Sequence, residues 1–475
     1  MRAPVSVVIL AAGKGTRMRS TLPKVLQPLA GRTLLAHVLD TALALDPCQI
    51  LVVYGHGGDQ VAAAHADYPV HWVEQPEQLG TGHAVACALP TIPDAHRVLV
   101  LYGDVPLVTP QTLAPLLEGE EEEELALLTA QVADPTGYGR IVRDAHGAVR
   151  AIVEEKDASP EQRRCREINT GLLAAPAEAL RRWMDDLSAD NAQGEYYLTD
   201  AVAAARHEGR SVTARVALEA TEAAGINDLL QLAEAERLWQ RRQAERLLRA
   251  GLRLVAPERF TLRGQVRHGT DSTVDADCLL EGEVVLGDGV SIGQGVVLRD
   301  CTLEDGAVIR PYTVAEEAHI GTGCEVGPFA HLRPGTVLEA QARVGNFVET
   351  KKAHLGSAAK ANHLSYVGDA EVGPRANLGA GTITCNYDGA TKHRTVIGAD
   401  AFVGSGTQLV APVRIGERAT IGAGTTVTRD AEPDALTVGR CRARTVPGWQ
   451  RPGLTPHTGA ADDDADPAAS GGIKE

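Results

Sequence analysis

Long apolar runs are missing from this sequence of 475 residues, and their absence excludes a membrane-spanning helix. No stretch approaches the roughly 18 uninterrupted apolar residues that a membrane span requires. The first apolar run, residues 5–12, is followed at once by Lys14 and Arg17. This run therefore predicts a buried strand rather than a signal peptide.

Paired cysteines and an excess of positive charge are also missing. The 8 cysteines include no CxxC pair, which argues against a zinc ribbon or a disulfide framework and favours a reducing cytoplasm. The 46 lysines and arginines against 62 aspartates and glutamates give a net charge of −16, so we expect neither nucleic acid nor an anionic membrane as a partner. Anionic metabolites are still compatible with this composition, because local cations can outweigh net charge.

Two different periodicities divide the chain. Glycine occurs 17 times in residues 1–250 but 27 times in residues 251–440. The first region alternates apolar runs at 5–10, 50–53 and 98–101 with helical stretches such as 34–45, which predicts an α/β domain with a parallel sheet between helices. Residues 228–248 predict one linker helix, capped by Asn227 or Asp228.

A period of six replaces the helical period after Gly264 and predicts a parallel β-helix of hexapeptide repeats. A Greek-key sandwich is the rival interpretation, but it predicts alternation with a period of two. The phase breaks near 351–355 and 382–395, where we expect loops to leave the coil. The aliphatic residues in phase are Val274, Leu280, Leu286, Ile292 and Leu298, then Ile320, Val326, Leu332, Leu338 and Val344, then Ile397, Val403, Leu409, Ile415, Ile421 and Val427.

The predicted domains are residues 1–227, a linker helix over 228–250, a β-helix over 251–450 and an acidic tail over 451–475. The tail is expected to be disordered, and the acidic run at 118–124 is expected to be a solvated loop.

A glycine loop follows the first strand and suggests a phosphate site. Gly13-Lys14-Gly15 is neither a Walker A loop nor a GxGxxG loop, and alone it is only a turn. Lys24 follows it, and Asp104 comes at the end of another apolar strand. Ligands of open α/β sheets bind at the carboxyl ends of strands, so these residues together favour a metal–phosphate site.

The β-helix carries its own polar residues near the phase breaks. Arg333, Lys351 and Lys352 place cations near one level, as an anionic sugar phosphate requires. His363 and Tyr366 lie nearby in the sequence, and a lone histidine is more often a surface residue than a base.

The N-terminal half resembles sugar-phosphate nucleotidyltransferases in the segments LAAGKGTRM, LPKVL, EQLGTGHA, LYGDVPL, DPTGYGRI, EINTG and NAQGEYYLTD. The C-terminal segments KANHLSYVGDAEVG and TITCNYDGA resemble acetyltransferase motifs. Over residues 5–450 the chain resembles the bacterial bifunctional N-acetylglucosamine-1-phosphate uridyltransferases/glucosamine-1-phosphate acetyltransferases. This resemblance implies a Rossmann-like nucleotidyltransferase domain, a left-handed β-helix, a homotrimer, and synthesis of the UDP-N-acetylglucosamine used for peptidoglycan and lipopolysaccharide.

The resemblance also implies roles in the N-terminal domain. Lys24 and the catalytic Arg17 would face the phosphates, and Asp104 and Asn227 would bind Mg²⁺. The residues that would hold the uridine end are Leu10, Ala11, Ala12, Gly13, Gln75, Gly80 and Thr81, with Tyr102 and Gly103 in the same binding set. Those that would recognise the acetylated sugar are Gly139, Glu154 and Asn169.

In the β-helix the resemblance implies that His363 takes a proton from the amine of glucosamine 1-phosphate as that amine attacks acetyl-CoA. Arg333 and Lys351 would hold the sugar phosphate. Residues implied to orient the sugar are Tyr366, Asn377, Asn386 and Tyr387, and those implied to line the acetyl-CoA groove are Ala380, Ser405, Ala423 and Arg440. Cys385 is interpreted as a bystander. Two rivals stay open: a single-activity nucleotidyltransferase with a regulatory β-helix, and a β-helix that is only a trimerisation scaffold.

Overall fold

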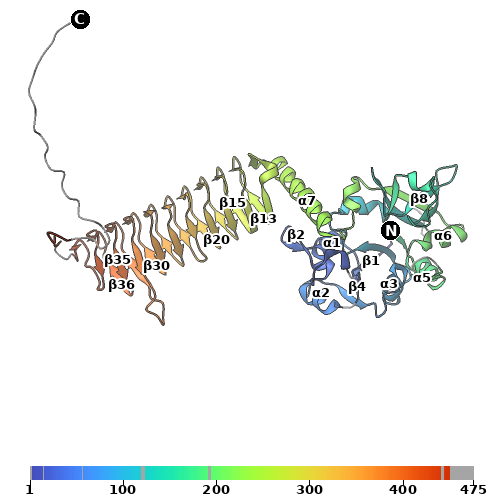
Figure 1. Ribbon diagram of the computed structural model, residues 1–475, viewed down its shortest axis with the longest axis horizontal. Coiled ribbons are helices and arrows are strands. Elements are labelled where there is room, and N and C mark those ends of the chain that lie inside the picture. Colours follow the sequence, from blue (N-terminus) through green and yellow to red (C-terminus); the bar gives the residue numbers. More distant parts are fainter. Residues whose placement is uncertain are drawn as a thin grey trace, which may run out of the picture.

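This computed structural model describes residues 3–13, 15–55, 57–118, 124–190, 194–439 and 443–449. An α/β domain and an elongated β-helix lie at opposite ends of one helix, α7 (Figure 1). None of the helices in these ranges combines the length and apolar character needed to cross a membrane.

The N-terminal domain contains a nine-stranded sheet with the central order β11-β7-β10-β6-β1-β4-β5. Strands β1 (Val5–Leu10), β4 (Gln49–Tyr54), β5 (His71–Glu74) and β6 (Arg97–Tyr102) are parallel, as predicted. The sheet is mixed rather than parallel throughout, because β10 (Glu167–Pro176) runs antiparallel to β6 and to β7 (Leu125–Gln131). Strands β8 (Arg140–Arg143) and β9 (Val149–Val153) form an antiparallel pair beside β10, and β11 (Val212–Val216) is parallel to β7.

Helices cover both faces of this sheet. Successive residues of β1 point to opposite faces, so Val7 and Ile9 join one hydrophobic cluster while Val8 joins the other. Helix α1 (Leu34–Leu43) begins at the predicted residue, where the Thr33 side chain accepts from the backbone N–H of Ala36, and ends two residues before the predicted 45. The other helices of this domain are α2 (Gly58–Ala64), α3 (Thr81–Ala88), α4 (Pro110–Leu113), α5 (Ala177–Asp185) and α6 (Asp200–His207).

Helix α7 (Leu229–Arg249) contacts both halves of the chain. Asp228 caps it by accepting from the backbone N–H of Gln231. Ala235 packs in a cluster with Met18 of the N-terminal domain, whereas Leu247 belongs to the core of the β-helix. Near the middle of the helix, the Gln240 side chain exchanges two hydrogen bonds of 2.8 and 2.9 Å with the backbone of Leu262, which ties the helix to the first coil.

The β-helix consists of two parallel sheets. One has 11 strands, from β12 (Arg253–Leu254) to β39 (Leu436–Thr437), and the other has 17, from β13 (Thr261–His268) to β38 (Thr426–Val427). Every aliphatic residue of the period-six series is at most 3% exposed. The period-six prediction is therefore confirmed, and the parallel pairing excludes the Greek-key sandwich.

One of the two predicted loops exists. The chain leaves the coil between β32 (Ile383–Cys385) and β33 (Thr395–Ile397), which confirms the break at 382–395, and the orange loop that projects from the coil in Figure 1 lies in this region. The loop predicted at 351–355 is wrong. Residue 351 ends β26 (Glu349–Lys351), and β27 (His354–Leu355) follows after two residues. The coil shortens here by one residue, since the buried positions Thr350 and Leu355 are five apart instead of six.

The acidic run needs one correction. Glu124, predicted to lie in a solvated loop, is buried and interacts electrostatically with Arg97. Residues 119–123 and the acidic tail lie outside the described ranges.

Candidate active site

A cavity of about 490 Å³ opens at the carboxyl ends of β1, β5 and β6. These ends meet at one edge of the sheet because the strands are parallel. Ten of the predicted residues line it: Leu10, Ala11, Ala12, Gly13, Lys24, Gln75, Gly80, Thr81, Tyr102 and Asp104. Gly103 lies directly behind this edge, where its N–H donates to the Leu10 carbonyl over 2.9 Å.

Two glycines allow the loops of this cavity to pack closely. Gly80 has a φ of +113°, and a Cβ there would lie 2.6 Å from the carbonyl oxygen of Tyr196. Gly15 has a φ of +58°, and a Cβ there would lie 2.7 Å from Cβ of Lys24. A side chain at either position would therefore both strain the backbone and displace a neighbour.

Four of the predicted polar residues converge at one side of the cavity. The Lys24 ammonium group donates to Asp104, and it also lies 3.2 Å from Oδ1 of Asn227. Arg17 donates to the same Asn227 oxygen over 2.9 Å. The backbone carbonyl of Asp104 accepts a hydrogen bond from the backbone N–H of Ile226 over 2.9 Å. The structure thus joins residues that are about two hundred positions apart in the sequence.

This group fits a small divalent cation. The carboxylate of Asp104 and the amide oxygen of Asn227 both face the Lys24 ammonium, so they already converge on one positive charge. Mg²⁺ prefers oxygen ligands and needs few from the protein, because it keeps several waters. Within the described ranges, no cluster of three or more histidine, cysteine or acidic side chains forms a metal site.

The three residues predicted to recognise the sugar also lie together. The Asn169 N–H donates to the Gly139 carbonyl over 2.8 Å, and a Cβ on Gly139 would lie 3.2 Å from a carboxylate oxygen of Glu154. Burial raises the pKa of Glu154, and the charges of Asp157 and Asp200 raise it further.

Tyr102 links this group to the cavity. Burial, followed by the charge of Asp104, raises the pKa of Tyr102 far above its usual value, so the phenol stays protonated. Its hydroxyl is hydrogen-bonded to Thr81.

Sequence reasoning missed four residues that line the cavity: Val25, Gln78, Ala84 and Glu195. Gln78 lies in the quoted segment EQLGTGHA, so a signal for it existed. Its side-chain amide donates to the Ala12 carbonyl over 2.7 Å and closes the loop after β1 against the loop after β5.

A second cationic group lies on the β-helix. Lys351 lies against Lys392, which was not predicted, and Arg333 is close enough to Lys351 to act on its charge. The pKa of Lys351 is lowered, first by Lys392, then by partial desolvation and by the charge of Arg333. Arg333 is also paired with Glu349 over 2.8 Å. Such crowded cations favour an anion. The signal for Lys392 was its place in the loop at 382–395.

The loop that carries Lys392 is held in place by its own hydrogen bonds. Asn386 donates to Asp369 over 2.5 Å and lies 3.5 Å from the Tyr366 hydroxyl, so these two predicted residues are neighbours. Tyr387 is exposed and forms an antiparallel bridge with Lys392. Backbone N–H groups of the loop and His393 lower the pKa of Asp388 far below its usual value.

Four predicted residues stack along one corner of the β-helix. His363 ends β28 (Lys360–His363), and its carbonyl accepts from Gly381 over 3.3 Å. On the following coils, the carbonyls of Ala380 and Ser405 accept from Gly406 (2.7 Å) and Gly424 (2.8 Å), which places Ala423 next in the column. Asn377 lies in β31 (Asn377–Leu378), the strand paired with β28.

The His363 ring and two further residues, Arg440 and Cys385, complete the description of the predicted acetyl site. The His363 ring is exposed and forms no hydrogen bond to another described residue. Arg440 lies outside the described ranges. Burial raises the pKa of Cys385, which gives this thiol little thiolate character.

Known proteins resemble both halves of the chain. The MobA-like NTP transferase domain matches residues 7–254, just over half of the chain. The GMPPB C-terminal domain matches residues 262–362, and the bacterial transferase hexapeptide (six repeats) matches residues 394–429. The chain is 77% identical over 475 residues to the bifunctional protein GlmU of Halorhodospira halophila, covering 100% of both proteins. The chain belongs to the GlmU family.

Other GlmU proteins match along nearly the whole chain. The protein of Alkalilimnicola ehrlichii is 58% identical over 463 residues, which cover 98% of this chain and 100% of that protein. That of Marinobacter nauticus is 54% identical over 450 residues, which cover 95% and 99% respectively. The predicted resemblance to a bifunctional family is thereby confirmed.

Proposed function

We propose that this chain makes UDP-N-acetylglucosamine in two steps at two separate sites. The β-helix transfers an acetyl group from acetyl-CoA to glucosamine 1-phosphate, and the N-terminal domain then joins the product to UTP with release of pyrophosphate. The observation that carries this proposal is the presence of two distant cationic groups, one around Lys24 and one around Lys351, in a chain of a bifunctional family. Each suits a phosphate-bearing substrate.

The uridylyl step needs charge neutralisation rather than a base. The phosphate oxygen of N-acetylglucosamine 1-phosphate is already anionic, and it forms a bond to the α-phosphorus of UTP as the bond to pyrophosphate breaks. The two substrates are both anions and repel each other. Lys24 and Arg17, which both contact Asn227, neutralise part of the charge on the substrates' phosphates. Asp104 and Asn227 would hold Mg²⁺, which would supply positive charge to offset the negative charge of the leaving pyrophosphate.

Uridine and the acetylated sugar bind to different residues of the N-terminal site. The loop after β1, together with Gln75, Gly80 and Thr81, holds uridine in the cavity of about 490 Å³. Gly139, Glu154 and Asn169 hold the acetylated sugar. Tyr102, half-buried and close to the Asp104 and Glu154 charges, separates the two regions and offers a protonated phenol.

The acetyl step needs a base, because an amine must lose a proton to form an amide. The amine of glucosamine 1-phosphate attacks the thioester carbon, the bond to the CoA sulfur breaks, and His363 accepts the proton. Arg333, Lys351 and Lys392 hold the sugar phosphate. The column of small residues Ala380, Ser405 and Ala423 lets the pantetheine arm lie along the coil, and Tyr366, Asn377, Asn386 and Tyr387 orient the sugar.

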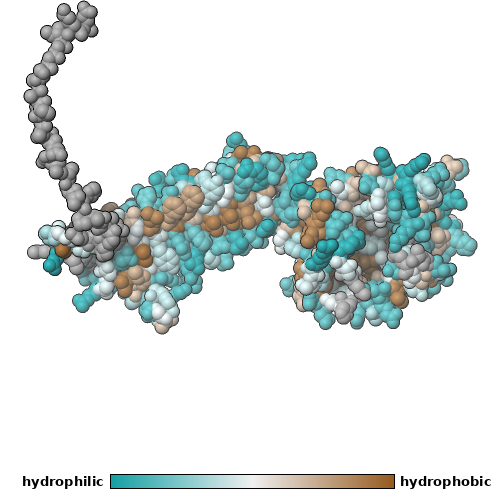
Figure 2. Space-filling view, viewed as in Figure 1, coloured by the Kyte–Doolittle hydropathy of each residue, from teal (hydrophilic) through white to brown (hydrophobic). Residues whose placement is uncertain are grey.

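An exposed apolar ridge on the β-helix supports assembly into a homotrimer. Tyr312, Phe329 and Phe347 stack on successive coils with ring centroids 5.3 and 5.4 Å apart, and Leu364 continues the ridge. These side chains are 47 to 64% exposed, and Figure 2 shows apolar surface running along the β-helix. Contiguous exposed apolar surface favours association. Leu364 follows His363 directly, so a copy packed on this ridge would border the acetyl site.

The cytoplasm is the proposed compartment. The seven cysteines of the described ranges are free, as expected where thiols stay reduced.

The test supplies glucosamine 1-phosphate, acetyl-CoA, UTP and Mg²⁺ and identifies the products. We expect UDP-N-acetylglucosamine and pyrophosphate with all components, N-acetylglucosamine 1-phosphate without UTP, and no acetylated product without acetyl-CoA. A protein that makes UDP-N-acetylglucosamine only when N-acetylglucosamine 1-phosphate is supplied in place of glucosamine 1-phosphate would instead be the single-activity nucleotidyltransferase.

A further inference from the structure

The side-chain amide of Gln75 is held in one orientation at the wall of the nucleotide cavity. Gln75 follows β5 directly and is 3% exposed, and its backbone N–H donates to the Tyr54 carbonyl over 2.8 Å. Its side-chain nitrogen, Nε2, lies 3.1 Å from the Gly80 carbonyl oxygen and 3.1 Å from Nδ1 of His83 on helix α3.

The hydrogen-bonding capacity of these groups settles which end of the amide faces the ligand. A backbone carbonyl only accepts, so the end of the amide that faces Gly80 must be the NH₂ group. The second N–H of that group points to Nδ1 of His83, which must then be the unprotonated, accepting nitrogen. The proton of the imidazole lies on Nε2, 3.8 Å from Sγ of Cys87. Both amide hydrogens are therefore used inside the protein.

The amide oxygen of Gln75 is the polar atom left for a ligand. Among the described residues, Oε1 of Gln75 has no hydrogen-bond partner, and Gln75 lines the cavity. An unpaired acceptor at a cavity wall favours a ligand that presents a donor and disfavours one that presents a lone pair.

We propose that His83 is a positioning residue that sets the base specificity of the uridylyl step by fixing the amide of Gln75. The inference rests on the proposed use of UTP. Uracil carries an N–H at position 3, which donates to Oε1 of Gln75. Cytosine carries a bare nitrogen at that position, so its lone pair faces the lone pairs of Oε1. His83 itself does not touch the base and acts only through Gln75.

The experiment compares two substitutions of one residue. His83→Leu removes the acceptor, whereas His83→Asn keeps an acceptor oxygen near the place of Nδ1. For each variant and the unaltered chain, kcat/KM is measured with UTP and with CTP, and with N-acetylglucosamine 1-phosphate as the second substrate. We expect the UTP/CTP ratio to fall about threefold to tenfold in His83→Leu, the effect of one net hydrogen bond, and to stay near the original value in His83→Asn.

The UTP/CTP ratio separates a positioning role from a role in stability, because a loss of folded protein lowers the rates with UTP and with CTP equally. An unchanged UTP/CTP ratio in His83→Leu, or an equal fall in both variants, would overturn the inference. If His83→Leu does not fold, His83→Ala is compared with His83→Asn in the same way. A failure of the proposed function looks different: the unaltered chain itself would show no transfer from UTP.

Discussion

Lys24 and Asp104 form an ion pair within the cavity at the carboxyl ends of β1, β5 and β6, 80 positions apart in the sequence, and both side chains are mostly buried. The same ammonium group also contacts Asn227. The lysine thus occupies the space between the two oxygens proposed to bind Mg²⁺. Metal binding and this ion pair compete for the Asp104 carboxylate.

Lys24→Met should therefore raise the affinity of the ligand-free protein for a divalent cation. Removing a positive charge next to two ligand oxygens takes away repulsion, and we expect a gain of about tenfold at low salt. Mn²⁺ titration followed by electron paramagnetic resonance measures this affinity without any turnover. Lys360→Met, which removes an exposed lysine of the β-helix, is the matched control and should leave Mn²⁺ affinity unchanged. Equal affinities in all three proteins would contradict the competition.

Asp104→Asn should abolish uridylyl transfer while acetyl transfer continues. The substitution removes the single carboxylate proposed for the metal, and we expect a loss of at least about 100-fold in kcat. Both activities are assayed on one preparation, so the acetyl-transfer rate reports that the chain is folded. Full uridylyl transfer by Asp104→Asn at saturating Mg²⁺ would rule out the metal assignment.

His363→Ala should slow acetyl transfer by about 10²–10⁴-fold, the usual contribution of a positioned base. The ring is exposed and has no hydrogen-bond partner among the described residues, so Tm should hardly change. Lys392→Ala offers a comparison, since losing a phosphate contact should mainly raise the KM for glucosamine 1-phosphate. Normal acetyl-transfer turnover in a folded His363→Ala protein would show that His363 is not the base.

The double variant Phe329→Ser, Phe347→Ser should weaken the proposed trimer. Both rings lie at corners of the coil and are about half exposed, so the variant removes apolar contact area without opening the core. Sedimentation should show monomers at concentrations where the unaltered chain is trimeric. Leu218→Ser, at a residue that is 73% exposed in the N-terminal domain, should leave the assembly intact. A trimeric double variant would place the interface elsewhere on the chain.

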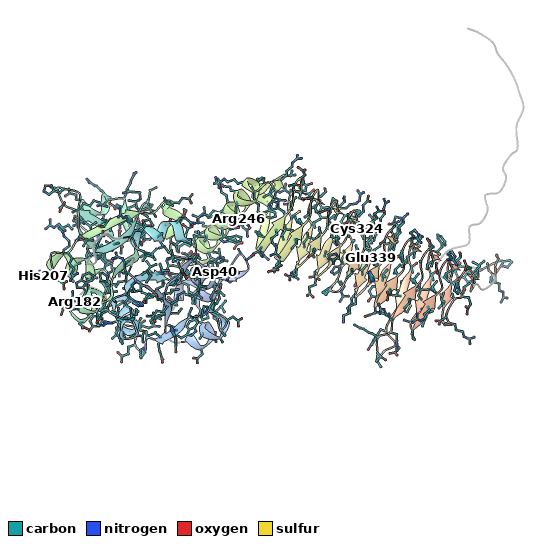
Figure 3. All side chains as sticks on the ribbon, turned by 180° about the vertical axis from the view of Figure 1, so that it is seen from behind. Asp40, Arg182, His207, Arg246, Cys324 and Glu339 are labelled. Atoms are coloured by element: carbon teal, nitrogen blue, oxygen red, sulfur yellow. The ribbon has the colours of Figure 1, made fainter. Side chains whose placement is uncertain are left out.

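Glu339 should make the stability of the β-helix depend on acid pH. Its carboxylate accepts from the Ser357 N–H and hydroxyl over 2.9 and 2.8 Å and lies 3.0 Å from Nε2 of His354, and these contacts, Ser357 foremost, lower its pKa. Figure 3 shows Glu339 on the coil beside Cys324.

A lowered folded-state pKa means that this stabilisation is complete above the ordinary pKa of glutamate and is lost as the pH falls through the folded-state value. Between about pH 5 and pH 3, Tm should thus fall less in Glu339→Gln than in the unaltered chain. Parallel Tm–pH curves would contradict this assignment.

Local patterns in the sequence were sufficient for the central strands, for helices α1 and α7 and for the repeats of the β-helix, whereas most residues of the cavity were implied by the resemblance to a known family. The period of six identifies Val274 to Val427 as inward-facing, because a coil of the β-helix repeats its geometry along the chain. The ends of the strands at 5–10 and 98–101 were enough to bring Gly13 and Asp104 to one edge, since parallel strands place their carboxyl ends together. Gln75 was implied only by the resemblance to a known family.

Only the tertiary structure decided which distant side chains meet. Nothing local indicates that Asn227 contacts Lys24, that Lys392 lies against Lys351, or that the coil shortens between Thr350 and Leu355 rather than forming a loop. A hydrophobic period is set by the geometry of a few neighbouring residues, and it can be read along the chain. The meeting of residues some two hundred positions apart depends instead on how whole elements pack, and that information is spread over the entire sequence.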